Sequence, residues 1–181
     1  MSETHAGFVG EGGDTAGGSR PFDQAQFRRV MGQFATGVSV VTTSSLEGKP
    51  HGLTVNAFMS VSLEPPLVLI SIDKKAETHP LLLEARRFCV NILSEGQKSI
   101  SERFASKQPD KFEGLSYRTG ATGAPILDGA IAWIDCTVVE TYEGGDHTLF
   151  LGEVKDLEAR GGKPLLFYGG KYHRLPDGSE I

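Results

Sequence analysis

Cysteine and positive charge are both scarce in this chain of 181 residues. Its two cysteines, Cys89 and Cys136, each lie inside an apolar run. They are too few for a disulfide framework, and their spacing matches no CxxC metal motif. Acidic residues outnumber basic ones by 23 to 18, which gives a net charge of −5. This balance argues against nucleic acid or an anionic membrane surface as the main partner.

Long hydrophobic runs and targeting signals are also missing. No apolar run approaches the length of about 20 residues that a membrane span needs. The N-terminus lacks a basic region followed by an apolar stretch, so we expect a cytoplasmic protein. The motifs GxSxG and HExxH and paired histidine or cysteine ligands are absent as well. The sequence therefore predicts neither a nucleophilic triad nor a metal site.

Composition divides the chain into one domain and two tails. Residues 1–20 contain six glycines and a single large apolar pair, Phe8-Val9, so they cannot bury enough surface to offset the ordering of the backbone. We expect a disordered tail there, one domain over residues 21–176 and a short C-terminal tail over 177–181. A domain of this size can bury a proper core.

Strand patterns dominate the domain. Asp23 followed by Gln26 predicts a helix that ends near Thr36-Gly37, and Thr78 and Ser94 cap two further helices, over 78–85 and 94–104. Tight turns and the absence of βαβ alternation favour a mainly β fold with inserted helices, an antiparallel barrel. The predicted strands cover residues 38–43, 53–63, 67–72, 88–93, 130–143, 147–156, 165–168 and 172–175.

The segment from Leu53 to Leu63 has the most informative pattern. Every second residue is apolar, which predicts one extended strand with this face in the core. The other face carries no charge and consists of Thr54, Asn56, Phe58, Ser60 and Ser62. Hydroxyls, an amide and a ring suit a large neutral polar ligand such as a heteroaromatic ring. The alternative is an ordinary exposed strand rich in Thr and Ser.

Six segments, in this order along the chain, resemble the flavin reductase-like family of small NAD(P)H:flavin oxidoreductases. They are Gln33–Thr43, Thr54–Ser62, Glu64–Leu67, Phe88–Leu93, Gly145–His147 and Pro164–Tyr168. The resemblance runs from about Phe22 to Leu175. It implies a split β-barrel, a homodimer and the transfer of hydride from a nicotinamide to a flavin. It also implies a separate flavin-dependent monooxygenase that receives the reduced flavin.

The same resemblance implies which residues bind the cofactors. The flavin ring is expected at Thr54, Val55, Asn56, Ala57, Phe58, Ser60 and Val61. The phosphate side is expected at Lys75, Ala76, Glu77, Phe104, Ser106 and Lys107, where Glu77 would repel a phosphate unless it faces a ribose hydroxyl. The nicotinamide dinucleotide is expected at His147, Phe167, Tyr168, Gly169, Gly170 and Tyr172.

Hydride transfer requires little chemistry from the protein beyond stacking two rings and placing hydrogen-bond donors, so we expect no catalytic acid, base or nucleophile. The predicted function is the NADH-dependent reduction of freely exchanging FAD or FMN. Two alternatives remain at this stage. One is a split barrel that binds a flavin or another cofactor without turnover, and the other is an oxidase-type flavoprotein with tightly held FMN.

Overall fold

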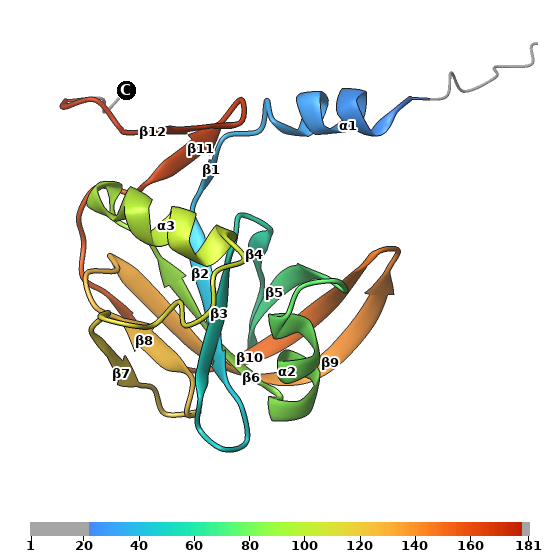
Figure 1. Ribbon diagram of the computed structural model, residues 1–181, viewed down its shortest axis with the longest axis vertical. Helices are drawn as coiled ribbons and strands as arrows, with labels where there is room; N and C mark the ends of the chain where they lie inside the picture. The colour runs from blue at the N-terminus through green and yellow to red at the C-terminus, as the bar shows by residue number, and fades with distance from the viewer. Residues whose placement is uncertain (1–21, 179–181) are drawn as a thin grey trace, which may run out of the picture.

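The computed structural model describes residues 22–178, which form a mainly β domain with three α-helices (Figure 1). The predicted tail over residues 1–20 lies outside the described residues. The helices are α1 (Gln24–Met31), α2 (Thr78–Ala85) and α3 (Lys98–Ala105), and a 3-10 turn η1 (Glu95–Gln97) precedes α3. The strands are β1 (Thr36–Gly37), β2 (Ser39–Ser44), β3 (Pro50–Val55), β4 (Phe58–Leu63), β5 (Pro66–Asp73), β6 (Arg87–Ile92), β7 (Tyr117–Thr119), β8 (Pro125–Leu127), β9 (Ala132–Gly144), β10 (His147–Ala159), β11 (Leu166–Tyr168) and β12 (Lys171–His173).

Seven antiparallel strands form the main sheet in the order β3-β2-β6-β9-β10-β5-β4. Its two edge strands, β3 and β4, follow each other in the chain and are separated only by Asn56 and Ala57. The two edges therefore meet at one end of the sheet while no ladder joins them, which makes the sheet a split barrel. The predicted fold class is confirmed.

The barrel interior is filled by side chains from most of these strands. The buried set comprises Val41, Val55, Val68, Ile70, Ile72, Leu82, Phe88, Val90, Cys136, Val138 and Phe150. A second cluster between the sheet and α3 comprises Val38, Val40, Leu93, Phe104, Leu127 and Leu165. Helix α3 is thus fixed to the outside of the barrel by an apolar contact of its own, and this contact positions one wall of the site.

The predicted single strand over residues 53–63 is wrong. The chain leaves the sheet at Asn56 and Ala57 and returns as β4 at the opposite edge. The break reverses which side chains face the core. Val55 before it and Phe58 after it both pack in the core. The apolar residues predicted to be buried beyond the break are exposed instead, Met59 by 56 %, Val61 by 49 % and Leu63 by 95 %. A β-bulge between Ser60 and Ser62 disturbs the register further. Alternation alone did not reveal the break, because Asn56 and Ala57 continue the apolar–polar alternation of the sequence across it.

Helix α1 also ends earlier than predicted. The Asp23 side chain accepts a hydrogen bond from the Gln26 amide at 2.6 Å, so the predicted N-terminal cap is present. The helix ends at Met31, however, and Thr36–Gly37 forms the short strand β1. Figure 1 shows α1 extending away from the barrel, and none of its residues is buried. Its apolar residues face solvent, namely Phe27, Val30 and Met31, with Phe22 and Phe34 on either side.

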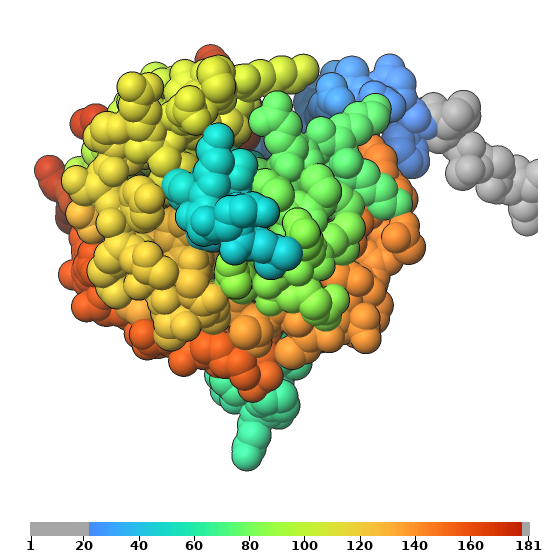
Figure 2. Space-filling model, turned by 60° about the horizontal axis from the view of Figure 1, so that its bottom comes forward, coloured from blue at the N-terminus to red at the C-terminus, as the bar shows by residue number. Residues whose placement is uncertain are grey.

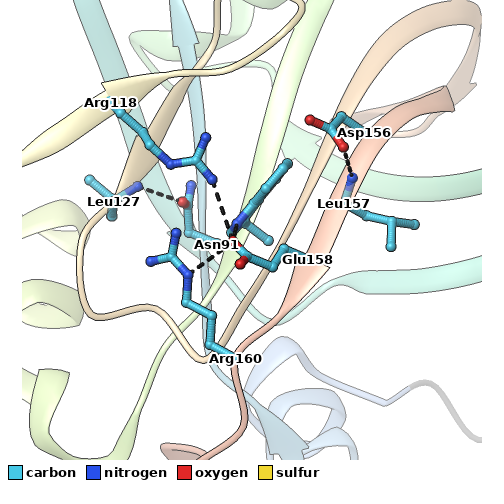
Figure 3. Close-up of polar contacts among 8 residues, drawn as sticks. Asn91, Arg118, Leu127, Asp156, Leu157, Glu158 and Arg160 are labelled. Atoms are coloured by element: carbon cyan, nitrogen blue, oxygen red, sulfur yellow. Dashed lines mark hydrogen bonds and ion pairs between the residues drawn. The ribbon is translucent and has the colours of Figure 1, made fainter.

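The long hairpin of β9 and β10 is secured on its outer face by a polar cluster (Figure 3). The Glu158 carboxylate accepts from Trp133 Nε1 at 2.9 Å and from Arg160 Nε at 3.0 Å. The Arg118 guanidinium lies 4.7 Å from the centre of the Trp133 ring and also reaches Glu158. Both arginines and the Trp133 indole therefore contact the same Glu158 carboxylate. We assign this cluster a structural role, because its charged groups are occupied by one another.

Gly152 on β10 lies directly against the packed interior of the barrel. It lies at a register shift of β10, and a Cβ there would stand 2.8 Å from Phe88 Cε1 and 3.0 Å from Cys136 Cβ. Both neighbours belong to the packed interior, so neither can move away freely. Only a residue without a side chain fits this position.

We expect Gly152→Ala to lower the free energy of unfolding by about 1–3 kcal/mol, because overpacking a core forces neighbours off their rotamers. Urea denaturation followed by circular dichroism measures the change. Gly96→Ala is the matched control, since nothing lies within 4 Å of a Cβ built there. Equal stability of the two variants would contradict the assignment of Gly152 to a packed wall.

Candidate functional site

A cavity of about 210 Å³ lies where the end of β3, helix α3 and the β11–β12 hairpin meet. We call it the β3–α3 cavity. Its lining combines residues far apart in the sequence: Val38, Thr54, Val55, Asn56, Ser101, Ala105, Phe167 and Tyr172. The structure thus brings together predicted residues from the Thr54 segment and from the C-terminal segment. Its walls are mostly apolar with a few polar groups, which is the usual make-up of a small-molecule site.

Hydrogen bonds tie the three walls of this cavity together. The Thr54 hydroxyl donates to the Ser101 carbonyl at 2.6 Å, and the Ser101 and Tyr172 hydroxyls lie 2.8 Å apart. These groups fix α3 and β12 relative to β3. The Asn56 side chain is exposed and has no hydrogen-bond partner among the described residues. Its amide is therefore the polar group of this cavity that is free to meet a ligand.

Close contact between α3 and β3 depends on Gly52. A Cβ at this position would stand 2.9 Å from Phe104 Cε1 and 3.0 Å from the Val41 carbonyl oxygen. The Phe104 ring therefore packs against bare backbone, which brings α3 within hydrogen-bond reach of Thr54. Phe104 is 1 % exposed, so its predicted cofactor role is confined to lining a wall.

A second cavity of about 330 Å³ shares Thr54 with the first, and we call it the lysine cavity. The predicted phosphate-side residues Lys75, Ala76, Glu77, Phe104, Ser106 and Lys107 all line it, together with Lys111. Three lysines against one glutamate give it a positive balance. Such a balance suits a phosphate, which binds best where cations and amide donors converge.

Of the three lysines that line this cavity, Lys111 is the one whose side chain bonds to the protein. Its Nζ donates to the Phe104 carbonyl at 3.1 Å and so covers the C-terminal end of α3. Burial lowers the pKa of Lys111, and the nearby Glu77 carboxylate opposes that change. The prediction from sequence did not include this residue, because no motif distinguishes it from an exposed lysine.

Two backbone amides beside the lysine cavity are already bonded within the protein. The Lys75 amide donates to the Asp73 carboxylate at 2.8 Å, and the Ala76 amide donates to the Asp73 carbonyl at 2.9 Å. Asp73 therefore occupies two amide donors in the turn that precedes α2. The lysine side chains are left as the main cationic groups of the cavity.

Several predicted residues lie outside both cavities. Phe58, Ser60 and Val61 are on the edge strand β4, and Ala57 precedes it. Tyr168, Gly169 and Gly170 form the β11–β12 turn, where the Tyr168 hydroxyl donates to Gln33 at 3.1 Å. His147 begins β10 opposite Asp73, two residues from Lys75, and its Nδ1 lies 2.7 Å from Asp146. That contact lowers the pKa of Asp146.

Neither cysteine lines the β3–α3 cavity or the lysine cavity. Both cysteines are free and buried, and burial raises the pKa of each thiol, that of Cys136 to about 12. Across residues 22–178, no group of histidine, cysteine and acidic side chains could hold a metal ion. No helix in the same range is long and apolar enough to span a membrane.

Comparison with known proteins identifies the family. Residues 31–176 match the model of the flavin reductase like domain. The chain belongs to this family. A flavin reductase of Pseudomonas putida is 45 % identical over 151 residues, which cover 83 % of this chain and 89 % of the relative.

Two solved structures of family members have the same fold. Component B of a nitrilotriacetate monooxygenase from Mycobacterium thermoresistibile is 44 % identical, with a TM-score of 0.84 over 87 % of this chain and 89 % of that one. An NADH:FAD oxidoreductase of Streptomyces globisporus, in complex with NAD and FAD fragments, is 41 % identical, with a TM-score of 0.82 over 87 % and 96 %. Both relatives span nearly the whole described domain.

The hydrogen bond from Thr54 to Ser101 leads to a prediction. Thr54→Val keeps the shape of the side chain but removes the hydrogen bond to the Ser101 carbonyl, which should cost about 0.5–1.5 kcal/mol of unfolding free energy. The melting temperature measures this loss, and Ser62→Ala, whose hydroxyl has no partner among the described residues, is the control. An unchanged melting temperature would mean that α3 is held on β3 by packing alone.

Proposed function

We propose that the protein is an NADH-dependent flavin reductase that reduces exchangeable FAD or FMN and passes the reduced flavin to a separate monooxygenase. The observation that carries the proposal is the pair of adjoining cavities, one apolar with a free amide and the other lined by three lysines. A flavin has this combination of a flat heteroaromatic ring and a phosphate. The relatives that match the chain include a flavin reductase and a monooxygenase component.

The residues of this chain would act by binding and orientation. The Asn56 amide would meet a polar edge of the ring, and Lys75 and Lys107 would face its phosphate. Phe167 and Tyr172, which the resemblance assigns to the nicotinamide dinucleotide, line the same cavity as Asn56. Bound flavin and nicotinamide supply the redox chemistry themselves. The protein's part is to hold the reacting atoms roughly 3–3.5 Å apart and to exclude water.

Mixing the purified protein with NADH and either flavin tests the proposal directly. Under anaerobic conditions the absorbance of oxidised flavin should disappear at a rate proportional to protein concentration. A barrel that only binds flavin would leave this absorbance unchanged. An oxidase-type protein would keep stoichiometric FMN through gel filtration, whereas a diffusible carrier should bind with micromolar affinity, about −8 kcal/mol.

Two substitutions should separate the flavin site from the nicotinamide site. Asn56→Leu removes the free amide at a cost of roughly 1–3 kcal/mol, so the flavin KM should rise about tenfold or more while the NADH KM holds. His147→Ala should do the reverse and weaken NADH use by about 5- to 30-fold. Steady-state kinetics with each substrate varied measures both. If either variant changed the flavin KM and the NADH KM equally, the residue it replaces would not belong to the site proposed for it.

We further propose a homodimer formed through the apolar surface of β4 and α1. Leu63 is 95 % exposed, and Met59 and Val61 beside it are about half exposed. The apolar residues of α1 are equally uncovered. Exposed apolar surface of this extent marks an interaction site, and both elements lie at the margin of the fold, where a second copy can cover them.

Sedimentation velocity should therefore give twice the mass of the chain. Leu63→Glu places a charge in the proposed contact and should shift the protein toward the monomer. Leu46→Glu is the matched control, because Leu46 is 62 % exposed in the β2–β3 turn, away from this surface. A wild-type monomer, or a Leu63→Glu variant that remains dimeric, would reject the proposed interface.

A further inference from the structure

Ser101 of α3 bonds to two different walls of the β3–α3 cavity. Its carbonyl accepts from the Thr54 hydroxyl of β3 at 2.6 Å, and its hydroxyl lies 2.8 Å from the Tyr172 hydroxyl of β12. Ser101 itself has no surface left for a ligand, because its exposed fraction is 0 %. Any effect of Ser101 on a ligand must therefore pass through the residues that it holds.

The β11–β12 hairpin that carries Tyr172 is not part of the barrel. It pairs only with β1, in a separate three-stranded sheet, and Figure 1 shows it beyond α3 at one end of the molecule. Among the described residues, the hydrogen bond between Ser101 and Tyr172 is the single one from a side chain of this hairpin to α3 or the barrel. Its other side-chain hydrogen bonds reach Gln33 or stay within the hairpin.

The Tyr172 ring is one of two aromatic rings on this wall of the cavity. It meets Phe167, its partner across the hairpin, edge to face with the ring centres 5.4 Å apart. Lys98 Nζ lies 5.8 Å from the centre of the Tyr172 ring. Both rings also pack against the second apolar cluster, but apolar contacts are non-directional. The hydrogen bond to Ser101 is thus the directional contact that fixes this wall relative to α3.

Asn56 and Tyr172 are connected through Ser101. Asn56 follows Thr54 by two residues at the end of β3. Two hydrogen bonds in series, from Thr54 to Ser101 and from Ser101 to Tyr172, therefore set the separation between the wall with the free amide and the aromatic wall. Hydride transfer needs the reacting atoms roughly 3–3.5 Å apart, and a misplacement of about 1 Å can cost about 100-fold in rate. The width of this cavity must therefore be held closely.

We propose that Ser101 is a positioning residue of the reductase, which holds the Tyr172 ring at the separation from β3 that stacks the nicotinamide on the flavin. The inference rests on the proposed flavin reductase function and adds to it a residue that touches neither cofactor. Without the Ser101 hydroxyl every group that lines the cavity is still present, but the aromatic wall can move away from β3. The stacked arrangement is then less populated.

Other contacts hold the lysine cavity. Lys111 Nζ anchors the loop of residues 108–113 to the Phe104 carbonyl. Lys49 Nζ of the β2–β3 hairpin lies 3.6 Å from the Asp110 carboxylate of the same loop. Figure 2 shows this hairpin, in cyan, between the green segment that contains α2 and the yellow segment that contains the loop. None of these contacts involves the β11–β12 hairpin, so we expect flavin affinity to survive when the bond between α3 and β12 is lost.

Single-turnover reduction of saturating flavin by NADH, followed by flavin absorbance without oxygen, measures the step in question. Ser101→Ala should slow hydride transfer about tenfold, whereas the flavin Kd should change less than about twofold. The long-wavelength charge-transfer absorbance of the stacked rings should weaken in parallel. Ser99→Ala, which removes an exposed hydroxyl from the same helix, is the matched control and should behave as the wild-type protein does.

Tyr172→Phe tests whether Ser101 acts through Tyr172. This change keeps the ring and removes the other half of the hydrogen bond, so it should slow hydride transfer to about the same extent. The double variant should be no slower than either single variant, because both changes remove one and the same interaction. Melting temperatures confirm that each variant is folded at the temperature of the assay.

A folded Ser101→Ala variant with the wild-type rate of hydride transfer would overturn the proposal. So would rate losses that multiply in the double variant, because Ser101 would then act independently of Tyr172. A flavin Kd that rises as much as the rate falls would also reject it, since the hydroxyl would then support binding in general. If NADH reduces neither flavin with the wild-type protein, the flavin reductase proposal itself fails. A wild-type protein that reduces flavin no faster than Ser101→Ala rejects the positioning role alone.

Discussion

The contact between α3 and β3 at Gly52 is the constraint on which the site depends. Because this position has no side chain, the Phe104 ring packs against the strand, and Thr54 can donate to the Ser101 carbonyl. Ser101 in turn holds Tyr172 of the C-terminal hairpin. One close approach thus aligns three segments from distant parts of the chain. The adjoining cavities lie along this contact, so the shape of the groove follows from how near the helix lies to the strand.

Local signals in the sequence predicted much of this fold. Helix α2 begins at Thr78 and ends at Ala85 as expected, and the Ser94–Gln97 capping box is present ahead of α3. The β9–β10 hairpin closes at Gly145 and Asp146, between the strands predicted over 130–143 and 147–156. Each of these features is determined by residues a few positions apart, through a cap, a tight turn or a period of two. Such patterns depend little on the rest of the structure.

Features that depend on contacts between distant segments were not predicted from the sequence. The break at Asn56 and Ala57 exists because β3 and β4 pair with strands at opposite edges of the sheet, which alternation cannot reveal. Ser101, Ala105 and Lys111 line the cavities because α3 and the loop after it fold over β3. The resemblance names Thr54, Val55, Asn56, Phe167 and Tyr172 as cofactor-binding residues, while the wall that Ser101 and Ala105 add to this cavity comes from tertiary packing alone.

The pattern of hydrogen bonds around the β3–α3 cavity also bears on how tightly a ligand can be held. The hydroxyls of Thr54, Ser101 and Tyr172 already bond to other protein groups, so a ligand gains little by bonding to them in place of water. The Asn56 amide has no partner within the described residues, and Lys75 and Lys107 are exposed to water. Exposed charges contribute weakly because solvent screens them. A site with one free amide and screened lysines favours modest affinity, and modest affinity is what a flavin that must leave after reduction requires.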